Sequence, residues 1–252
     1  MKKIILILFL AFVTMQGYTQ VKKCAVISVF GNRNLSDDPL DTKLYEALLK
    51  DSSFNIAGTV NEYEKLVRNE FLDLFPFPFK DKAEVINSDE YKALDSITVY
   101  KTYAWEKSKF NWADPLIGAD GYLKIAPWLG DAKVIKKAFE VFPDVDAVLI
   151  AYIDFNLYDA VGIGGISSKK VYAYANIKVF NSDAKRIFKV KDRSSSKKGV
   201  TALGGFVLDP DKLKPMVFDA AEQLFADMKK KFPKKLEKMA KKIDKMAGED
   251  DN

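Results

Sequence analysis

The chain has 252 residues, of which 48% are hydrophobic and 30% charged, a composition typical of a packed globular protein. It contains no histidine and a single cysteine. The missing imidazole excludes Ser-His and Cys-His catalysis, most zinc sites and the usual proton shuttle near neutral pH. A single thiol excludes an internal disulfide.

The formal net charge of +5 is unevenly distributed along the chain. Residues 229–245 carry nine lysines against Glu237 and Asp244, so a mildly acidic body precedes one basic arm. We expect Pro233 to break or kink the final helix and to begin this amphipathic arm over 233–252. Such an acidic body is not suited to nucleic acid, so we expect no nucleic-acid partner.

The first 19 residues have the pattern of a secretory signal peptide. A basic start precedes an apolar run over 4–13, which is too short to span a bilayer core that needs about 20 residues. We expect cleavage after Thr19 and a periplasmic or secreted mature protein. Cys24 follows a valine and two lysines where a lipoprotein has small apolar residues, so we expect a buried thiol without a lipid.

The mature chain begins with one strand and two helices. Residues 23–30 form a short β-branched run, which predicts a buried strand. Helical spacing of apolar residues predicts helices over about 42–50 and 60–75, the second ending before Pro76.

An irregular, aromatic-rich insertion over about 75–118 interrupts a single α/β domain spanning 20–232. The FPFPF segment (75–79) cannot be a helix or a central strand, and we expect it to pack on the body as a rigid connector, with a partner-binding knob as the alternative. Residues 88–107 are expected to be helical, with Ser88 as the N-cap. Three aromatic residues close the insertion and serve as core or as a stacking surface for a ligand: Trp105, Phe110 and Trp112.

The second half of the chain carries the clearest β pattern. Residues 121–126 predict a strand and 131–142 an amphipathic helix, so that with the strand from Ala147 they form a βαβ unit. Strands over 147–158, 171–180 and 186–191 then form an antiparallel meander. The predicted fold class is therefore α/β (mixed α+β), with a mixed sheet and a long C-terminal helix from about Met216.

This order of elements resembles the α/β domain of the TolB amino-terminal and CsgG-like envelope proteins. The resemblance rests on the Asp146-Ala147-Val148-Leu149 entry to a strand and on the turn VFNSDAKRIF (179–188), and it covers about two thirds of the mature chain. Relatives usually carry a glycine near Ala184 or Lys185, and this chain does not. The resemblance implies an accessory or assembly domain that contacts other envelope components, and it supplies no catalytic residue.

Two Gly/Ser/Lys-rich segments are expected to meet at one end of the meander. If the three strands run up, down and up, the tip over 162–170 and a loop over 193–205 lie side by side. Their polar residues would bind an anionic group or a protein partner, with ordinary solvated loops as the alternative. The candidate residues are Ser167, Ser168, Lys169, Lys170, Arg193, Lys197 and Lys198. The glycines in this tip lack the spacing of a phosphate-binding loop.

The basic arm supports a second hypothesis, association with an anionic membrane surface, because an apolar stripe runs beside its lysines. The residues that would contact the membrane are Lys234, Lys235, Lys238, Lys241 and Lys242. The alternative is a solvated helix docked on the body by its stripe.

An enzyme would have to use carboxylates or a metal bound by them. Asp144, Asp146, Asp154 and Asp159 show no recognisable pairing, so we name no catalytic or metal-binding residue and expect no cofactor. A carboxylate- or metal-dependent hydrolase is the third hypothesis, and the sequence leaves the oligomeric state open.

Overall fold

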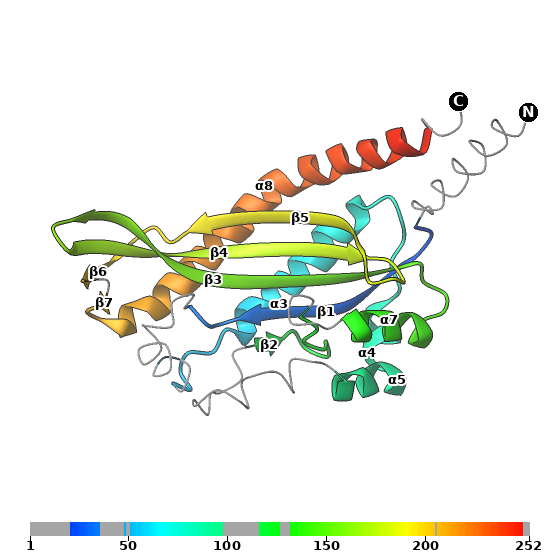
Figure 1. Ribbon diagram of the computed structural model, residues 1–252, viewed down its shortest axis with the longest axis horizontal. Helices are drawn as coiled ribbons and strands as arrows, with labels where there is room; N and C mark the ends of the chain where they lie inside the picture. The colour runs from blue at the N-terminus through cyan, green and yellow to red at the C-terminus, as the bar shows by residue number, and fades with distance from the viewer. Residues whose placement is uncertain are drawn as a thin grey trace, which may run out of the picture.

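A seven-stranded mixed sheet forms the centre of the protein (Figure 1). The computed structural model describes residues 21–35, 48, 51–97, 116–126, 132–204 and 206–248. The strand order is β2-β1-β3-β4-β6-β7, and β5 also pairs with β4. The strands are β1 (Cys24–Asn32), β2 (Leu116–Gly118), β3 (Ala147–Ile163), β4 (Ile166–Phe180), β5 (Arg186–Ser195), β6 (Val200–Leu203) and β7 (Phe206–Val207).

Helices cover both faces of the sheet at the β1 and β3 end. They are α3 (Ala57–Leu66), the π-helix η3 (Val67–Phe71), the 3-10 helix η4 (Leu72–Leu74), α4 (Lys82–Ile86), α5 (Asp89–Ala93), η5 (Leu94–Ile97), α7 (Ala132–Val141), η7 (Pro210–Lys212) and α8 (Leu213–Gly248). The core on one face joins α3 and α8, where Tyr63 stacks on Phe225 with ring centroids 6.0 Å apart. The core on the other face joins α4, α5 and α7 around the buried Tyr91 and Ile135.

The strand pairing confirms the predicted fold class. β1 and β3 are parallel, and β3, β4 and β5 form the antiparallel meander. The apolar run at the start of β3 is buried on both faces because both helical layers cover it there. The clean alternation in β4 follows from a different cause: Val171, Ala173 and Ala175 face the core under α8, whereas the residues between them face the opposite side.

The strand predicted over 121–126 is wrong. Only Leu123 forms a parallel bridge to β1, opposite Ser28. A bulge at Ile27 shifts the register of β1, and the hydroxyl of Ser28 donates a hydrogen bond to the Leu123 carbonyl (2.6 Å) and accepts one from the Ile125 N–H (3.0 Å). Hydrogen bonds of the Ser28 side chain thus take the place of the backbone hydrogen bonds that a paired strand would form here. The segment that pairs with the other half of β1 is β2, within the predicted insertion.

The FPFPF segment packs on the body, as predicted. Phe75 and Phe77 are buried, and the Cys24 N–H donates to the Pro78 carbonyl (3.0 Å) while the Lys80 N–H donates to the Cys24 carbonyl (2.8 Å). The segment therefore covers the outer edge of β1 at its start. Ser88 caps α5 as expected, because its hydroxyl accepts from the Tyr91 N–H.

The turn after β4 contains a residue with a Cβ atom in a left-handed conformation. Ala184 has φ +60°, a left-handed conformation that costs a residue with a Cβ atom about 1–2 kcal/mol. The conformation is held by hydrogen bonds between Asn181 and Lys185, in which the Asn181 carboxamide accepts the Lys185 N–H (2.9 Å) and the Asn181 N–H donates to the Lys185 carbonyl (3.0 Å). Tertiary context therefore imposes a strained residue at this turn.

Ala184→Gly is expected to stabilise the protein by about 0.5–1 kcal/mol, because relief of the strain exceeds the entropy that glycine adds to the unfolded chain. Denaturant unfolding followed by circular dichroism measures the change. Ala93→Gly, at the end of α5, is the control and is expected to change stability in the opposite direction. Equal destabilisation by both variants would contradict the left-handed conformation.

The final helix runs through Pro233 without a break. α8 extends from Leu213 to Gly248, and Phe232 and Leu236 on either side of the proline are buried against the body. The predicted boundary at 233 therefore does not end the helix, because tertiary packing of this stripe outweighs the hydrogen bond that proline cannot donate.

Several predictions lie outside the described residues. They are the leader over 1–19, the helix over 42–50 apart from Leu48, residues 98–115 with Trp105, Phe110 and Trp112, and the last four residues of the arm. Within the residues that are described, no helix combines the length and the apolar character needed to cross a bilayer.

Candidate functional site

A long β-hairpin carries the predicted site away from the helical layers (Figure 1). β3 and β4 pair up to Ile163 and Ile166, and Gly164 and Gly165 make the two-residue turn with φ +61° and +83°. Two successive residues with positive φ are typical of the tight hairpin turn whose twist matches its strands, which explains the adjacent glycines. We call residues 159–170, 196–204 and 206–208 the hairpin end.

The predicted loops at this end are wrong, because most of their residues are in strands. Ser167 to Lys170 lie in β4, and β6 pairs with them at Ala202, Thr201 and Val200. Arg193 lies in β5, so only 196–199 link β5 to β6 along the same edge of β4. The small polar residues in these segments form a tight turn and a short link between two edge-paired strands.

The candidate residues meet at one end, as predicted, but divide between the two faces of the hairpin. Ser167 and Lys169 face Asp159: the Ser167 hydroxyl donates to its carboxylate (2.9 Å), and the Lys169 ammonium lies 3.8 Å from it with a side chain only 14% exposed. These two polar groups are already partnered within the hairpin.

The opposite face presents tyrosines beside cations. Lys170 lies opposite Tyr158, and Arg193 opposite Tyr174, so each pair shares one face of the sheet. Tyr172 contacts both other tyrosine rings, with centroids 5.0 and 4.5 Å away. The Tyr158 hydroxyl also donates to Ser195 (3.0 Å), which fixes this aromatic row.

The link over 196–199 holds two lysines in a fixed backbone. The buried Ser196 donates its N–H to the Val171 carbonyl (2.7 Å), and its hydroxyl accepts the Val171 N–H (3.2 Å). The Lys197 N–H donates to Asp219 of α8 (2.6 Å). The side chains of Lys197 and Lys198 remain exposed, whereas that of Lys170 is half-buried.

The hairpin end also carries an apolar patch that sequence reasoning missed. Most of the large hydrophobic side chains that are exposed in the described part of the chain lie here. We call them the apolar tip: Val161 (69% exposed), Ile163 (84%), Ile166 (56%), Leu203 (54%) and Leu208 (61%). The signal in the sequence was the pair of isoleucines flanking two turn glycines. Clustered exposed apolar side chains mark interaction sites.

Cations are crowded on the tyrosine face nearer the body. Lys178 lies directly opposite Lys189, and its ammonium lies 4.7 Å from the centroid of the Tyr152 ring. Burial first, and then Lys189 and Arg186, lower the pKa of Lys178 to about 8. Sequence reasoning placed no site here, although the alternating lysines of β4 and β5 could have indicated it.

Lys178→Met is expected to remove a pH-dependent destabilisation of the folded protein. The folded pKa lies below the unfolded value of 10.5, so the unfolded chain binds more protons between about pH 8 and 10.5 and wild-type stability rises over that range. The stability of the wild type relative to Lys178→Met is therefore expected to increase from pH 7.5 to 10, measured by urea unfolding. A difference that stays constant over this range would contradict the lowered pKa.

The basic stretch of α8 is partly committed to the sheet. The Lys235 ammonium lies 2.9 Å from the Asp192 carboxylate and donates to the Lys191 carbonyl (3.0 Å), so Lys235 is not available to a membrane. Lys234 and Lys238 are exposed, and the side chains of Lys241 and Lys242 lie outside the described set. Since Phe232 and Leu236 are buried, the apolar stripe in this part of α8 is docked on the body.

The fold and the hairpin end define a mixed α/β protein with a projecting apolar and basic β-hairpin. Among the described residues, no three or more Cys, Asp or Glu side chains gather as metal ligands would.

No family model and no curated protein matches the chain. Several solved structures match it, including the following two. Lipoprotein GNA1162 from Neisseria meningitidis is 11% identical, with a TM-score of 0.30 over 82% of this chain and 99% of that one. The hypothetical protein CT253 from Chlamydia trachomatis is 14% identical, with a TM-score of 0.28 over 83% and 96%. Scores this low carry no inference about function.

Proposed function

We propose that this chain is an exported, non-enzymatic accessory or assembly module of the cell envelope, which docks through its hairpin end on a protein partner or an anionic envelope component. The observation that supports it best is the apolar tip with the exposed Lys197 and Lys198 and the half-buried Lys170 beside it. A solvated hairpin would need neither the isoleucines nor the leucines. Apolar anchors beside cations suit a surface that is apolar at its centre and anionic around it.

Location and class belong to the same proposal. The predicted signal peptide supports a periplasmic or secreted protein without a lipid on Cys24, which is buried at the start of β1. The resemblance to TolB amino-terminal and CsgG-like domains supports an envelope role. We propose no cofactor and no nucleic-acid partner.

Charge reversal tests the docking surface. Replacing Lys170, Lys197 and Lys198 with glutamate is expected to weaken association with the envelope fraction at least tenfold, because three favourable charges become repulsive. The matched control reverses Lys65, Lys133 and Lys136, which are exposed on α3 and α7. Unchanged sedimentation with the envelope fraction, or an equal loss in the control, would contradict the proposal.

Vesicles separate the two classes of partner. Binding to vesicles with 30% anionic lipid, lost on the hairpin charge reversal, indicates an anionic lipid surface. Binding only to envelope fractions that contain protein indicates a protein partner. Binding to vesicles that disappears when residues 237–252 are deleted, but survives the hairpin reversal, would support the membrane-contacting C-terminal helix instead.

A further inference from the structure

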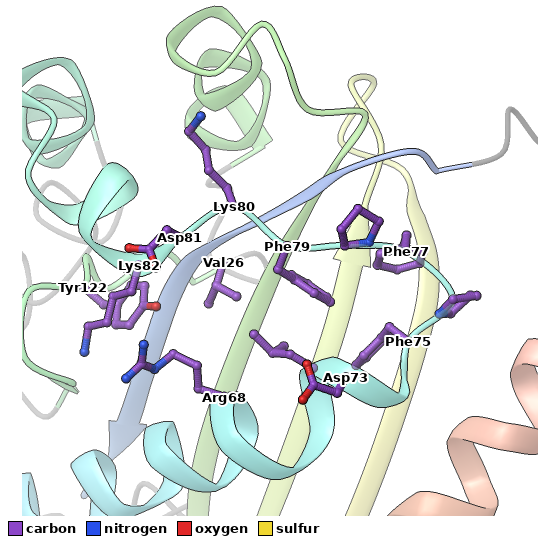
Figure 2. Close-up of a pocket in the computed structure, with 13 residues that line it drawn as sticks. Val26, Arg68, Asp73, Phe75, Phe77, Phe79, Lys80, Asp81, Lys82 and Tyr122 are labelled. Atoms are coloured by element: carbon purple, nitrogen blue, oxygen red, sulfur yellow. The ribbon is translucent and has the colours of Figure 1, made fainter.

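A cavity of about 630 Å³ lies between the FPFPF segment and the helices η3 and η4, over Val26 of β1 (Figure 2). Its volume is in the range of small-molecule sites. No residue of the hairpin end lines it, so it is separate from the proposed docking surface. The apolar and polar residues around it are segregated into two ends.

One end of the cavity is aromatic. The rings of Phe75, Phe77 and Phe79 lie with their centroids 5.5 Å from one another, and Leu72 completes this wall. The backbone hydrogen bonds of Cys24 to Pro78 and Lys80 hold the wall against β1. This end is therefore formed before any ligand arrives.

The other end carries two cations on one buried carboxylate. Glu64 is 5% exposed, and its Oε1 lies 3.1 Å from the Lys82 ammonium and 3.1 Å from Nε of Arg68. Lys82 also lies over the Tyr122 ring, 5.0 Å from its centroid. Figure 2 shows the guanidinium of Arg68 pointing across the cavity toward Tyr122 and Lys82. A buried carboxylate held by two cations leaves one positive charge uncompensated.

Over the whole lining the carboxylates of Asp73 and Asp81 offset this excess, but neither forms an ion pair with Arg68 or Lys82. Asp81 accepts the Ala83 N–H as the cap of α4 (2.7 Å), and Asp73 is exposed at the rim. Lys80 pairs with Glu84 and Asp144 (3.0 Å each), and Figure 2 shows it pointing away from the cavity. Arg68 belongs to the π-helix η3, and π-helical turns recur at functional sites.

We infer that this cavity binds a small amphipathic anion, with an apolar chain or ring against Phe75, Phe77 and Phe79 and a single carboxylate beside Arg68 and Lys82. The apolar wall does not suit a sugar, and the cationic groups of Arg68 and Lys82 do not suit a cation. The bidentate donors of Arg68 match a carboxylate in geometry as well as charge. The inference does not depend on the proposed docking function.

Titration calorimetry on the full chain tests the site with decanoate as the probe. Decanoate is expected to bind saturably below 1 mM and at least fivefold more tightly than decan-1-ol, which has the same chain without the charge. A parallel titration with 4-phenylbutanoate distinguishes an aromatic body from a linear one. Absence of saturable binding for both acids, or equal affinity for decanoate and decan-1-ol, would overturn the inference.

Arg68→Gln locates the binding. Its side chain is 41% exposed and Glu64 keeps Lys82, so the variant is expected to fold, which circular dichroism verifies. We expect the dissociation constant for decanoate to rise at least fivefold and that for decan-1-ol to change less than twofold. Arg186→Gln, at an exposed position of β5, is the matched control and should bind as the wild type does. Unchanged decanoate binding by Arg68→Gln would place the ligand elsewhere and contradict the site.

Discussion

Replacing Phe232 with alanine is expected to lower the free energy of unfolding by about 3–5 kcal/mol, the usual cost of removing a buried phenylalanine. Phe232 is fully buried, and its ring centroid lies 4.8 Å from that of Phe71 in η3. It also adjoins Pro233, where the sequence predicts the start of a separate arm. The substitution therefore measures whether this part of α8 belongs to the folded body.

Urea unfolding provides the measurement, and Lys234→Ala is the matched control. Lys234 lies on the exposed side of the same helical turn, so its loss should change stability by less than about 0.5 kcal/mol. If Phe232→Ala also costs less than about 1 kcal/mol, the helix beyond Phe232 is a detachable arm and the membrane hypothesis for it gains support.

Replacing Ile163 and Ile166 together with aspartate is expected to reduce association with the envelope fraction more than tenfold. Both side chains are more than half exposed at the apolar tip, so the stability of the fold should change little. The association should weaken because two charged groups replace the apolar side chains that contact the partner. Thermal melting checks the first expectation and co-sedimentation checks the second.

The control for the apolar tip uses two exposed apolar residues far from it in the fold. Leu74 (38% exposed) and Ile97 (43%) lie in the short helices η4 and η5, and both are changed to aspartate together. This control should associate as the wild type does. An equal loss in both double variants would show that added negative charge, and not the tip, weakens the association.

Side-chain period was sufficient to predict the meander. The alternation of Val171, Ala173 and Ala175 reflects a sheet covered by α8 on one face, and such a pattern allows one register only. The amphipathic helix over 131–142 was predicted equally well, because one face of α7 packs on the sheet. Both elements could be predicted because their core-facing residues recur at the regular spacing of a strand or a helix.

Predictions failed where a single side chain or an edge decided the structure. The hydroxyl of Ser28 holds Leu123 and Ile125 beside β1, which no periodicity in 121–126 reveals. The strands β6 and β7 are short edge strands, with too few residues for alternation to separate them from a loop. The predicted break at Pro233 is wrong because proline removes only one local hydrogen bond. The helix continues because buried residues on both sides of Pro233 pack against the body.

The sequence predicted where the candidate residues lie in the fold, but not which contacts they make or that exposed apolar residues lie beside them. The meander topology correctly brought the two polar segments to one end, and the exposed Lys197 and Lys198 and the half-buried Lys170 were among the predicted residues. Sequence could not show that Asp159 engages Ser167 and Lys169, since that depends on register. The sequence also could not show that the apolar residues of the tip are exposed to solvent. Their exposure depends on which other segments of the chain pack against them.

Site-specific photocrosslinking in intact cells tests the docking surface most directly. A photoreactive amino acid replaces Ile163 at the apolar tip in one strain and Ile97 in η5 in another. We predict that Ile163 gives one discrete adduct, with an envelope protein or with lipid, and that Ile97 does not give it. No adduct from Ile163, or the same adduct from both positions, would contradict docking through the hairpin end.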